Sequence, residues 1–179
     1  VPGQTVELTI EVVLRRPAGL KLTRLAFPDG SLQDVDAPLA LNEKKIIKHE
    51  VAIPADAAVS VPYWLAVPAS AGRQNVPDAR LIGDPRQPAP LGVTATFEAA
   101  GRALRIEVPV QYAATDPVRG ERLRETLIVP PATVTPARVA AMSVGGKPAP
   151  LVLRVRAGRD GVKGQVTLPV PAGWRVAPP

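Results

Sequence analysis

The residues best suited to acid–base chemistry lie in the run Asp116-Pro117-Val118-Arg119-Gly120-Glu121. Two carboxylates beside an arginine can act as general acid and base if they face each other across a cleft. Asp-Pro and Gly are also common turn formers between strands. We favour the turn, and the same choice applies to Asp84 in the run Gly83-Asp84-Pro85.

Histidine and cysteine limit the other kinds of active site. The chain has one histidine, His49, and no cysteine. A metal site that needs two imidazoles is therefore excluded, and a Ser-His-Asp site would have to use His49. The sequence holds no Gly-rich phosphate loop, nucleophile elbow or metal-ligand pair. We expect no catalytic residue, no metal and no cofactor in this chain, and we expect His49 to face solvent.

Aromatic side chains are the remaining candidates for binding. Tyr63 and Trp64 are adjacent on a predicted strand, so they should face opposite sides of its sheet. We expect Trp64 to lie in the core, with a ligand platform as its alternative, whereas Tyr63 fits either role equally well. Trp174 is expected to pack over the end of a sandwich. The candidate ligand-binding residues are Tyr63, Trp64, Arg73, Asp84, Tyr112, Asp116 and Arg119.

The charge pattern bears on possible partners. The 179 residues include 22 Lys+Arg and 16 Asp+Glu, which gives a net charge of +6. The basic residues are spread along the chain with acids between most of them, and only two Trp, two Tyr and two Phe could stack on bases. This pattern argues against nucleic-acid binding. No apolar run reaches the roughly 18 residues of a membrane-spanning helix, so we expect no membrane span.

Short strands between Pro and Gly turns would have to position these residues. Residues 5–16 begin in strict alternation, with Val6, Leu8 and Ile10 on one side, as in a half-buried strand. Prolines interrupt nearly every window of ten residues, so helices are disfavoured and the class is all-β. The predicted strands are 5–16, 20–27, 45–53, 59–67, 93–99, 103–112, 122–129, 134–142, 150–156 and 163–169. The irregular stretch 68–90 is long, and loops of that length tend to be functional.

The number of strands suggests two domains. Residues 1–131 supply about seven strands, enough for one immunoglobulin-like β-sandwich. Residues 132–179 supply about three, which would leave one apolar face uncovered. We therefore expect a complete sandwich over 1–131 and part of a second over 132–179, whose missing strands lie beyond Pro179. Because the chain opens at Val1 rather than Met, we expect a processed chain or an excised fragment.

Several segments resemble regions of known bacterial proteins. The opening VPGQTVEL (1–8) and the segment GQVTLPVPAGW (164–174) resemble immunoglobulin-like repeats that follow catalytic domains in carbohydrate-active proteins. Residues 60–131 resemble the C-terminal, non-catalytic region of large PIG-L (LmbE-like) deacetylases. The matching motifs are PYWL (62–65), LIGDP (81–85), PVQY (109–112) and DPVRGE (116–121), of which the last is the most specific.

The resemblance implies that any catalysis lies in another part of the parent protein. Members of the family carry a zinc-dependent N-acetylglucosaminyl deacetylase domain, with a His-Pro-Asp-Asp type motif, ahead of this region. This chain lacks that motif, so zinc is expected only upstream. The resemblance thus implies an accessory module, periplasmic or extracellular, whose partners are the upstream catalytic domain and a glycan. The alternative is a protein–protein interaction or assembly module of an unrelated exported bacterial protein, which would pair through exposed strand edges.

Overall fold

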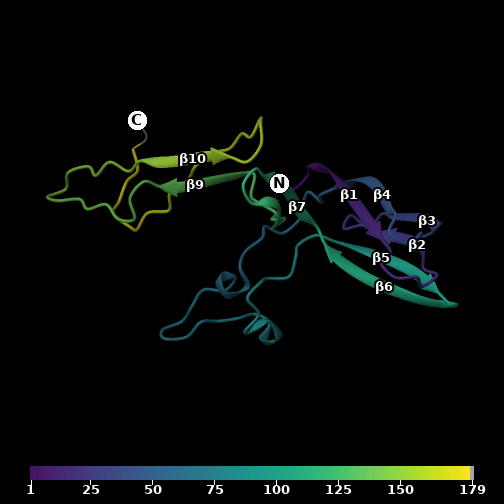
Figure 1. The fold of residues 1–179 in the computed structure, drawn as a ribbon. Coiled ribbons are helices and arrows are strands. Elements are labelled where there is room, and N and C mark those ends of the chain that lie inside the picture. The colour runs from purple at the N-terminus through teal and green to yellow at the C-terminus, as the bar shows by residue number, and fades with distance from the viewer. Residues whose placement is uncertain (178–179) are drawn as a thin grey trace. The chain divides into compact units, whose positions relative to one another are not determined.

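The computed structural model describes residues 1–177, and these form an all-β fold, which confirms the predicted class (Figure 1). Its only helical segments are two short 3₁₀ turns, η1 (Tyr63–Leu65) and η2 (Ala79–Leu81). The strands are β1 (Thr5–Val13), β2 (Lys21–Ala26), β3 (Leu32–Pro38), β4 (Lys44–Ala52), β5 (Gly92–Ala99), β6 (Arg102–Pro109), β7 (Gln111–Asp116), β8 (Gly120–Glu125), β9 (Ala132–Pro136) and β10 (Leu153–Ala157).

The chain divides into two compact units. One unit runs from Pro2 to Val129 and holds strands β1 to β8. The other begins at Pro130, includes Val1, and holds β9 and β10.

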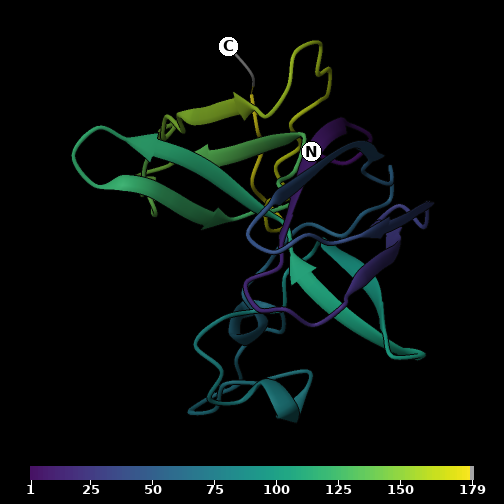
Figure 2. The same cartoon turned by 45° about the vertical axis from the view of Figure 1, so that its right-hand side comes forward.

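Two antiparallel sheets with a shared apolar core make up most of the larger unit. One sheet pairs β1 with β4, and the other has the order β3-β2-β5-β6 (Figures 1 and 2). The core between them is the cluster Leu8, Leu22, Leu25, Phe27, Ile47, Val51, Val93, Ala95 and Phe97. On β4 and β5 these residues recur at alternate positions, because every second side chain of a strand faces the same side. On β2 the buried Leu22 and Leu25 are three positions apart, because the register of that strand shifts between Leu22 and Arg24. This is the arrangement of a β-sandwich; the immunoglobulin strand order remains a prediction.

The hairpin of β5 and β6 is the most regular element of the four-stranded sheet. Its strands pair without a break from Gly92↔Pro109 to Ala99↔Arg102. The two residues between them, Ala100 and Gly101, have φ of 48° and 73°, as a tight two-residue hairpin turn requires. The sequence predicted this hairpin correctly, although it extended the second strand to Tyr112. The strand ends at Pro109 instead, and Val110 separates it from β7.

Two strand predictions before residue 70 were wrong. Residues 59–67 form no strand and contain the 3₁₀ turn η1, because Pro62 and Pro68 cannot donate to a ladder. Conversely β3 was missed, because its outward residues Asp34 and Asp36 have low strand propensity. It forms because the hairpin turn at Asp29-Gly30 returns the chain alongside β2.

The β7–β8 hairpin begins earlier than predicted. Its strands pair from Gln111↔Glu125 to Asp116↔Gly120, so much of the predicted turn at 115–121 is strand. Neither strand has a buried residue. The predicted strand at 122–129 is correct only as far as Glu125.

The smaller unit contains one antiparallel pair, β9 with β10. The predicted strands at 134–142 and 150–156 overlap these two with shifted ends. Residues 163–169 form no strand, because none of the described residues supplies them with a hydrogen-bonded neighbour and Pro169 has no N–H to donate. The predicted second domain also includes residues 178–179, which lie outside the described part of the chain. That the smaller unit is part of a second sandwich stays a prediction.

Candidate functional site

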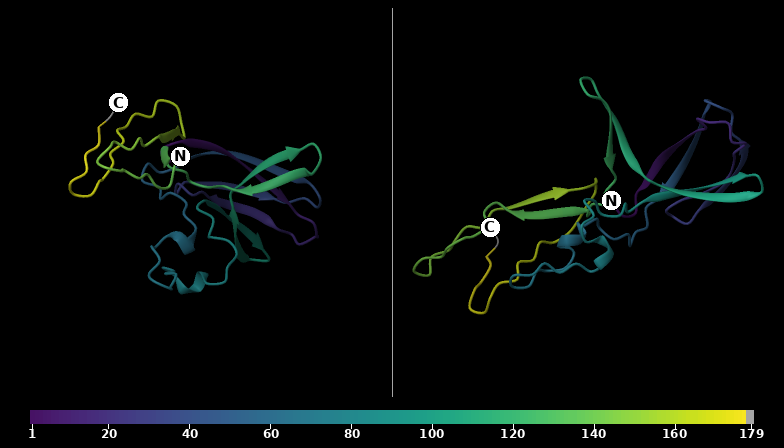
Figure 3. Two further views of the ribbon diagram at one scale, coloured as in Figure 1. Left: turned by 90° about the vertical axis from the view of Figure 1, so that its left-hand side faces the viewer. Right: turned by 60° about the horizontal axis from the view of Figure 1, so that its bottom comes forward.

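A long loop between β4 and β5, residues 53–91, holds the aromatic pair singled out from the sequence (Figure 3). Its polar side chains bond to its own backbone. Asn75 donates from Nδ2 to the Pro68 carbonyl at 2.9 Å, and Gln74 donates from Nε2 to the Trp64 carbonyl. Asp78 accepts from the Arg80 N–H at 3.0 Å and also binds its guanidinium. These bonds replace the ladder that a strand would have supplied.

The rings of Tyr63 and Trp64 meet edge to face, with centroids 5.0 Å apart and an interplanar angle of 87°. The Tyr63 hydroxyl donates to the backbone carbonyl of Asp84 at 2.9 Å. This bond joins two parts of the loop that are 21 residues apart in sequence. Trp64 is 40% exposed, so the prediction of a core tryptophan is wrong, as is that of two residues on opposite faces of a strand. In the 3₁₀ turn η1, successive side chains fan out by about a third of a turn instead.

The loop also holds Arg73 and Asp84, each beside a turn. The backbone of Arg73 pairs with that of Ser70 in both directions, at 3.1 and 3.0 Å, which leaves its guanidinium exposed. The Asp84 carboxylate accepts from the Arg86 N–H at 3.0 Å, a turn-forming bond. The fold therefore brings together Tyr63, Trp64 and the backbone of Asp84, while the Asp84 carboxylate has a structural partner.

The remaining candidates lie on a different element, the β7–β8 hairpin. Tyr112 is exposed near one end, and Asp116 and Arg119 lie at the other. The Asp116 carboxylate accepts from the N–H groups of Val118 and Arg119, at 2.8 and 2.9 Å. These two bonds hold the pKa of Asp116 below its usual value. Asp116 therefore forms the turn that we favoured from the sequence.

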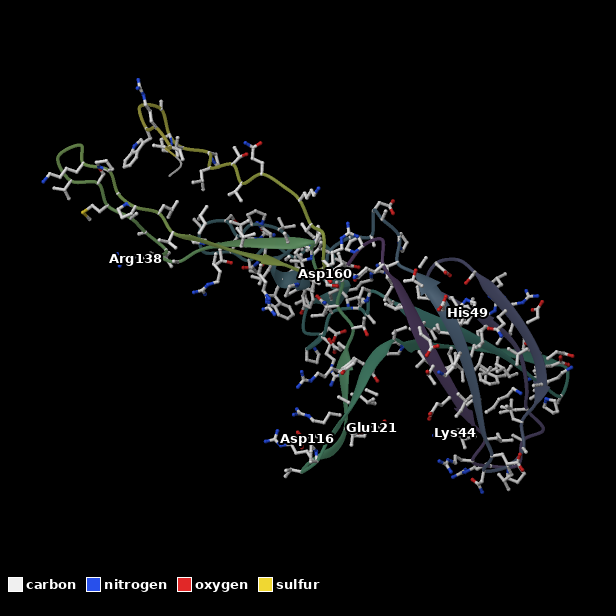
Figure 4. All side chains as sticks on the ribbon, turned by 90° about the horizontal axis from the view of Figure 1, so that it is seen from above. Lys44, His49, Asp116, Glu121, Arg138 and Asp160 are labelled. Carbon is white, nitrogen blue, oxygen red and sulfur yellow. The ribbon has the colours of Figure 1, made fainter. Side chains whose placement is uncertain are left out.

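Asp116 and Glu121 are both near the tip of the hairpin (Figure 4). Glu121 is opposite Thr115 and exposed. Neither carboxylate lines the cavity beside Arg24 or the cavity beside Arg86. A carboxylate that is kept ionised by two N–H groups, on an open turn, is poorly suited to donate a proton at neutral pH.

Two shallow cavities lie in the larger unit. The larger, about 450 Å³, is on the outer face of the four-stranded sheet and is lined by Thr23, Arg24, Asp34, Asp36, Thr96 and Arg105. Arg24 is already paired with Asp34 at 2.6 Å. The smaller, about 160 Å³, is lined by Arg86, Gln87, Ala89, Pro109, Val110, Gln111 and Glu125. There the Arg86 guanidinium lies 3.6 Å from the Glu125 carboxylate, and the side-chain oxygen of Gln87 is buried without a hydrogen-bond partner.

His49 has contacts that the sequence interpretation missed. It lies on the core face of β4, opposite Leu8, so the expectation of a solvent-facing side chain was wrong. The parity of its position with Ile47 and Val51 was the signal that could have shown this. Its ring stacks on Phe27 with centroids 3.6 Å apart, and Nε2 lies 3.1 Å from the hydroxyl of Ser31.

The Ser31–His49 pair does not have the arrangement of a nucleophile and its base. The Ser31 hydroxyl donates to the Asp29 carboxylate at 2.6 Å, so the imidazole Nε2 has to donate to the serine oxygen. A catalytic triad needs the reverse, with the carboxylate on the imidazole and the serine proton directed at it. The network instead ties the β2–β3 turn to β4, because Asp29 also accepts from the N–H of Ala52 at 3.4 Å.

The described residues contain no group of three or more His, Cys, Asp and Glu side chains that could hold a metal ion. Within the same residues, no helix has the length and apolar character needed to cross a bilayer. Comparisons with protein-family models, curated proteins and solved structures find no match to this chain.

Proposed function

We propose that the chain is a non-catalytic accessory β-sandwich module of an exported bacterial deacetylase of the PIG-L (LmbE-like) type, and that it binds glycan through the loop at 53–91. The observation that carries the proposal of glycan binding is the half-exposed Trp64 ring, which is held edge to face against Tyr63. Aromatic faces suit the apolar faces of sugar rings, and polar groups around them bond to hydroxyls. Arg73, which is exposed, is such a group in the same loop.

The hydrogen bonds within the loop support this proposal. The hydroxyl of Tyr63 fixes the loop at Asp84, and the amide of Asn75 fixes it at Pro68. A loop that is ordered before binding loses less conformational entropy when a ligand arrives, so its contacts contribute more to affinity. The accessory role is supported by the lack of the family's zinc motif in this sequence, so under this proposal deacetylation belongs to another part of the parent protein.

Titration with oligomers of N-acetylglucosamine and with cell-wall oligosaccharides tests glycan binding. The chain has two tryptophans, so Trp174→Phe leaves Trp64 as the only indole reporter. We expect a saturable change in its fluorescence and a matching heat in calorimetry. Trp64→Ala should abolish the heat, Arg73→Ala should weaken it, and Trp174→Ala, a matched loss of an exposed indole in the smaller unit, should leave it unchanged. If none of these sugars gives a heat of binding, the glycan-binding part of the proposal is wrong. Only the role of positioning a catalytic domain is then left.

The accessory role has its own test in the natural sequence upstream of Val1. A His-Pro-Asp-Asp motif in that sequence is the expected result. Its absence would overturn the deacetylase assignment and favour the alternative, an assembly module of an unrelated exported protein. The open edge of strand β6 in the four-stranded sheet is the observation that favours that alternative.

A further inference from the structure

We infer that two copies of this chain dimerise by antiparallel pairing of their β6 strands, with Ile106 opposite the partner's Ile106 on the twofold axis. This inference is independent of glycan binding and of the deacetylase assignment. Four features of the strand carry it: its open edge, its uncovered apolar column, the direction of its backbone groups and its charges.

Strand β6 is an open edge of the four-stranded sheet (Figures 1 and 2). All eight of its residues are exposed, and it pairs with β5 alone in one unbroken register. The opposite edge, β3, has the features by which proteins prevent such pairing. It carries Asp34 and Asp36, ends at Pro38, and its pairing with β2 is interrupted by a register shift. Strand β6 also carries charged residues and ends at a proline, Pro109, but its pairing with β5 has no register shift.

The same strand has an uncovered apolar column. Leu104, Ile106 and Val108 lie opposite Phe97, Ala95 and Val93 of β5, which belong to the buried core. The three β6 side chains therefore point to the core side of the sheet, yet they are 50%, 43% and 52% exposed. The facing sheet has two strands, β1 and β4, and does not cover this fourth column. A second β6 strand would place an identical apolar column beside it, 4.7–4.9 Å away, the spacing of paired strands.

Backbone geometry determines which β6 residues can bond to a partner. The N–H of Val110 donates to the Leu91 carbonyl at 2.9 Å. In an antiparallel ladder, residues that bond to a given neighbour alternate with residues that face away from it. Residues 104, 106 and 108 therefore bond to β5, and the N–H and C=O groups of Ala103, Arg105 and Glu107 face the open side. Pro109 has the same parity, so its missing N–H is also on the open side, and a partner residue placed opposite it receives no hydrogen bond from it.

The charges select one register. In the dimer, β6 residues whose backbone groups face the open side must pair with residues of the same kind in the partner. Because these residues alternate along the strand, the twofold axis has to pass through a residue and not between two residues. An axis at Arg105 would place two arginines opposite each other, and an axis at Glu107 would place two glutamates opposite each other. An axis at Ile106 places Arg105 opposite the partner's Glu107, twice, and gives each pair both ladder hydrogen bonds. The described residues supply no ion-pair partner to Arg105 or to Glu107, so both side chains are available.

Other registers are weaker. An axis at Leu104 would place Arg105 opposite the partner's Ala103 and would leave Glu107 opposite the turn at Gly101. The axis at Ile106 also places Leu104 opposite the partner's Val108, in non-hydrogen-bonded pairs whose side chains approach most closely. The chain has a net charge of +6, which opposes non-specific association of two copies. Matched charges and matched apolar residues therefore favour this single pairing.

Sedimentation velocity of the full chain over a range of concentrations, at low and high salt, tests the dimer. We expect a monomer–dimer equilibrium that weakens with salt. Arg105→Glu alone and Glu107→Arg alone each create two like-charge pairs, and each should weaken the dimer by on the order of tenfold or more. The double variant R105E/E107R restores both pairs and should dimerise like the unchanged chain. A mixture of the two single variants should form heterodimers, because each supplies the charges that the other needs.

Matched charge reversals on the exposed strand β8 serve as controls. Arg122→Glu and Glu121→Arg change the net charge by the same amounts and should leave the dimer unchanged. Circular dichroism of each variant checks that it is folded. A chain that is monomeric at every concentration overturns the inference. A double variant that is folded but stays monomeric also overturns it. The same holds if both single variants are folded and dimerise as well as the unchanged chain.

Discussion

At the scale of single residues, the side chain of Asp29 joins the β2–β3 turn to strand β4. Its carboxylate accepts from the Ser31 N–H at 2.9 Å, the Ser31 hydroxyl at 2.6 Å and the Ala52 N–H at 3.4 Å. The bonds from Ser31, with smaller contributions from Ala52 and the nearby His49, hold the pKa of Asp29 below its usual value. A short turn residue thus connects β2, β3 and β4.

We predict that Asp29→Ala lowers the free energy of unfolding by about 1 kcal/mol at pH 7, because the donors at Ser31 and Ala52 lose their acceptor. Asp29→Asn keeps a side-chain oxygen and should cost less. Urea unfolding followed by circular dichroism measures both. If Asp29→Ala lowers the free energy of unfolding no more than Asp29→Asn does, these bonds do not contribute to stability.

The lowered pKa of Asp29 also predicts a dependence on pH. A carboxyl group with a lower pKa in the folded than in the unfolded state stabilises the fold above its unfolded pKa. That contribution is lost as the pH falls through the folded pKa, so the change lies below the ordinary value of 3.8. The advantage of the unchanged chain over Asp29→Asn should therefore be smaller at a pH below 3.8 than at neutral pH. Urea unfolding at both pH values checks this, and a constant difference would contradict it.

At the scale of elements, buried and exposed leucines separate the sandwich from the β7–β8 hairpin. Leu22 on β2 is fully buried in the main core, whereas Leu123 on β8 is mostly exposed. We predict that Leu22→Ala lowers the free energy of unfolding by about 3 kcal/mol, since it leaves a cavity. Leu123→Ala should cost less than about 1 kcal/mol. Equal costs, measured by urea unfolding, would mean that the hairpin packs against other apolar groups.

The turn of the β7–β8 hairpin allows a more local test. Asp116→Ala removes the acceptor of the Val118 and Arg119 N–H groups. Neither strand of the hairpin has a buried residue, so the effect should stay within the element. We predict faster amide hydrogen exchange in residues 111–125 with an unchanged midpoint of global unfolding. Asp116→Asn is the matched control, because its side-chain oxygen can still cap the turn. A shifted midpoint would show that the hairpin contributes to the core.

The sequence predicted strands well where apolar residues alternate and poorly where they do not. β1, β4 and β5 were predicted with nearly correct bounds, because one face of each supplies the core. The edge strand β3 was missed, since its polar outward residues have no such pattern. At the candidate site, the sequence located Tyr63, Trp64 and the long loop. It could not show the hydroxyl of Tyr63 on the Asp84 carbonyl, because contacts between residues far apart in the chain depend on the fold.

At the scale of the whole molecule, apolar burial is concentrated in the larger unit. The buried hydrophobic residues of the described chain all lie between Leu8 and Ile128. The second cluster, Ile53, Leu91 and Ile128, joins the ends of the long loop to the segment after β8. The core therefore begins and ends within residues 2–129, although the loop that carries Trp64 interrupts it for nearly forty residues. Such a loop is tolerated because the entropy of closing it grows only slowly with its length.

This distribution of burial predicts how the chain behaves when it is shortened after Val129. None of the described residues after Ile128 is buried, and the pair β9–β10 is a two-stranded hairpin of a kind that is marginal in water. A chain of residues 1–129 should therefore unfold cooperatively at the same urea midpoint as the full chain. In the full chain, amides of residues 130–177 should exchange with solvent much faster than those of β2 and β5. A lower midpoint for the shortened chain, or slow exchange after Pro130, would show that the smaller unit has a stabilising interface that its own burial does not supply.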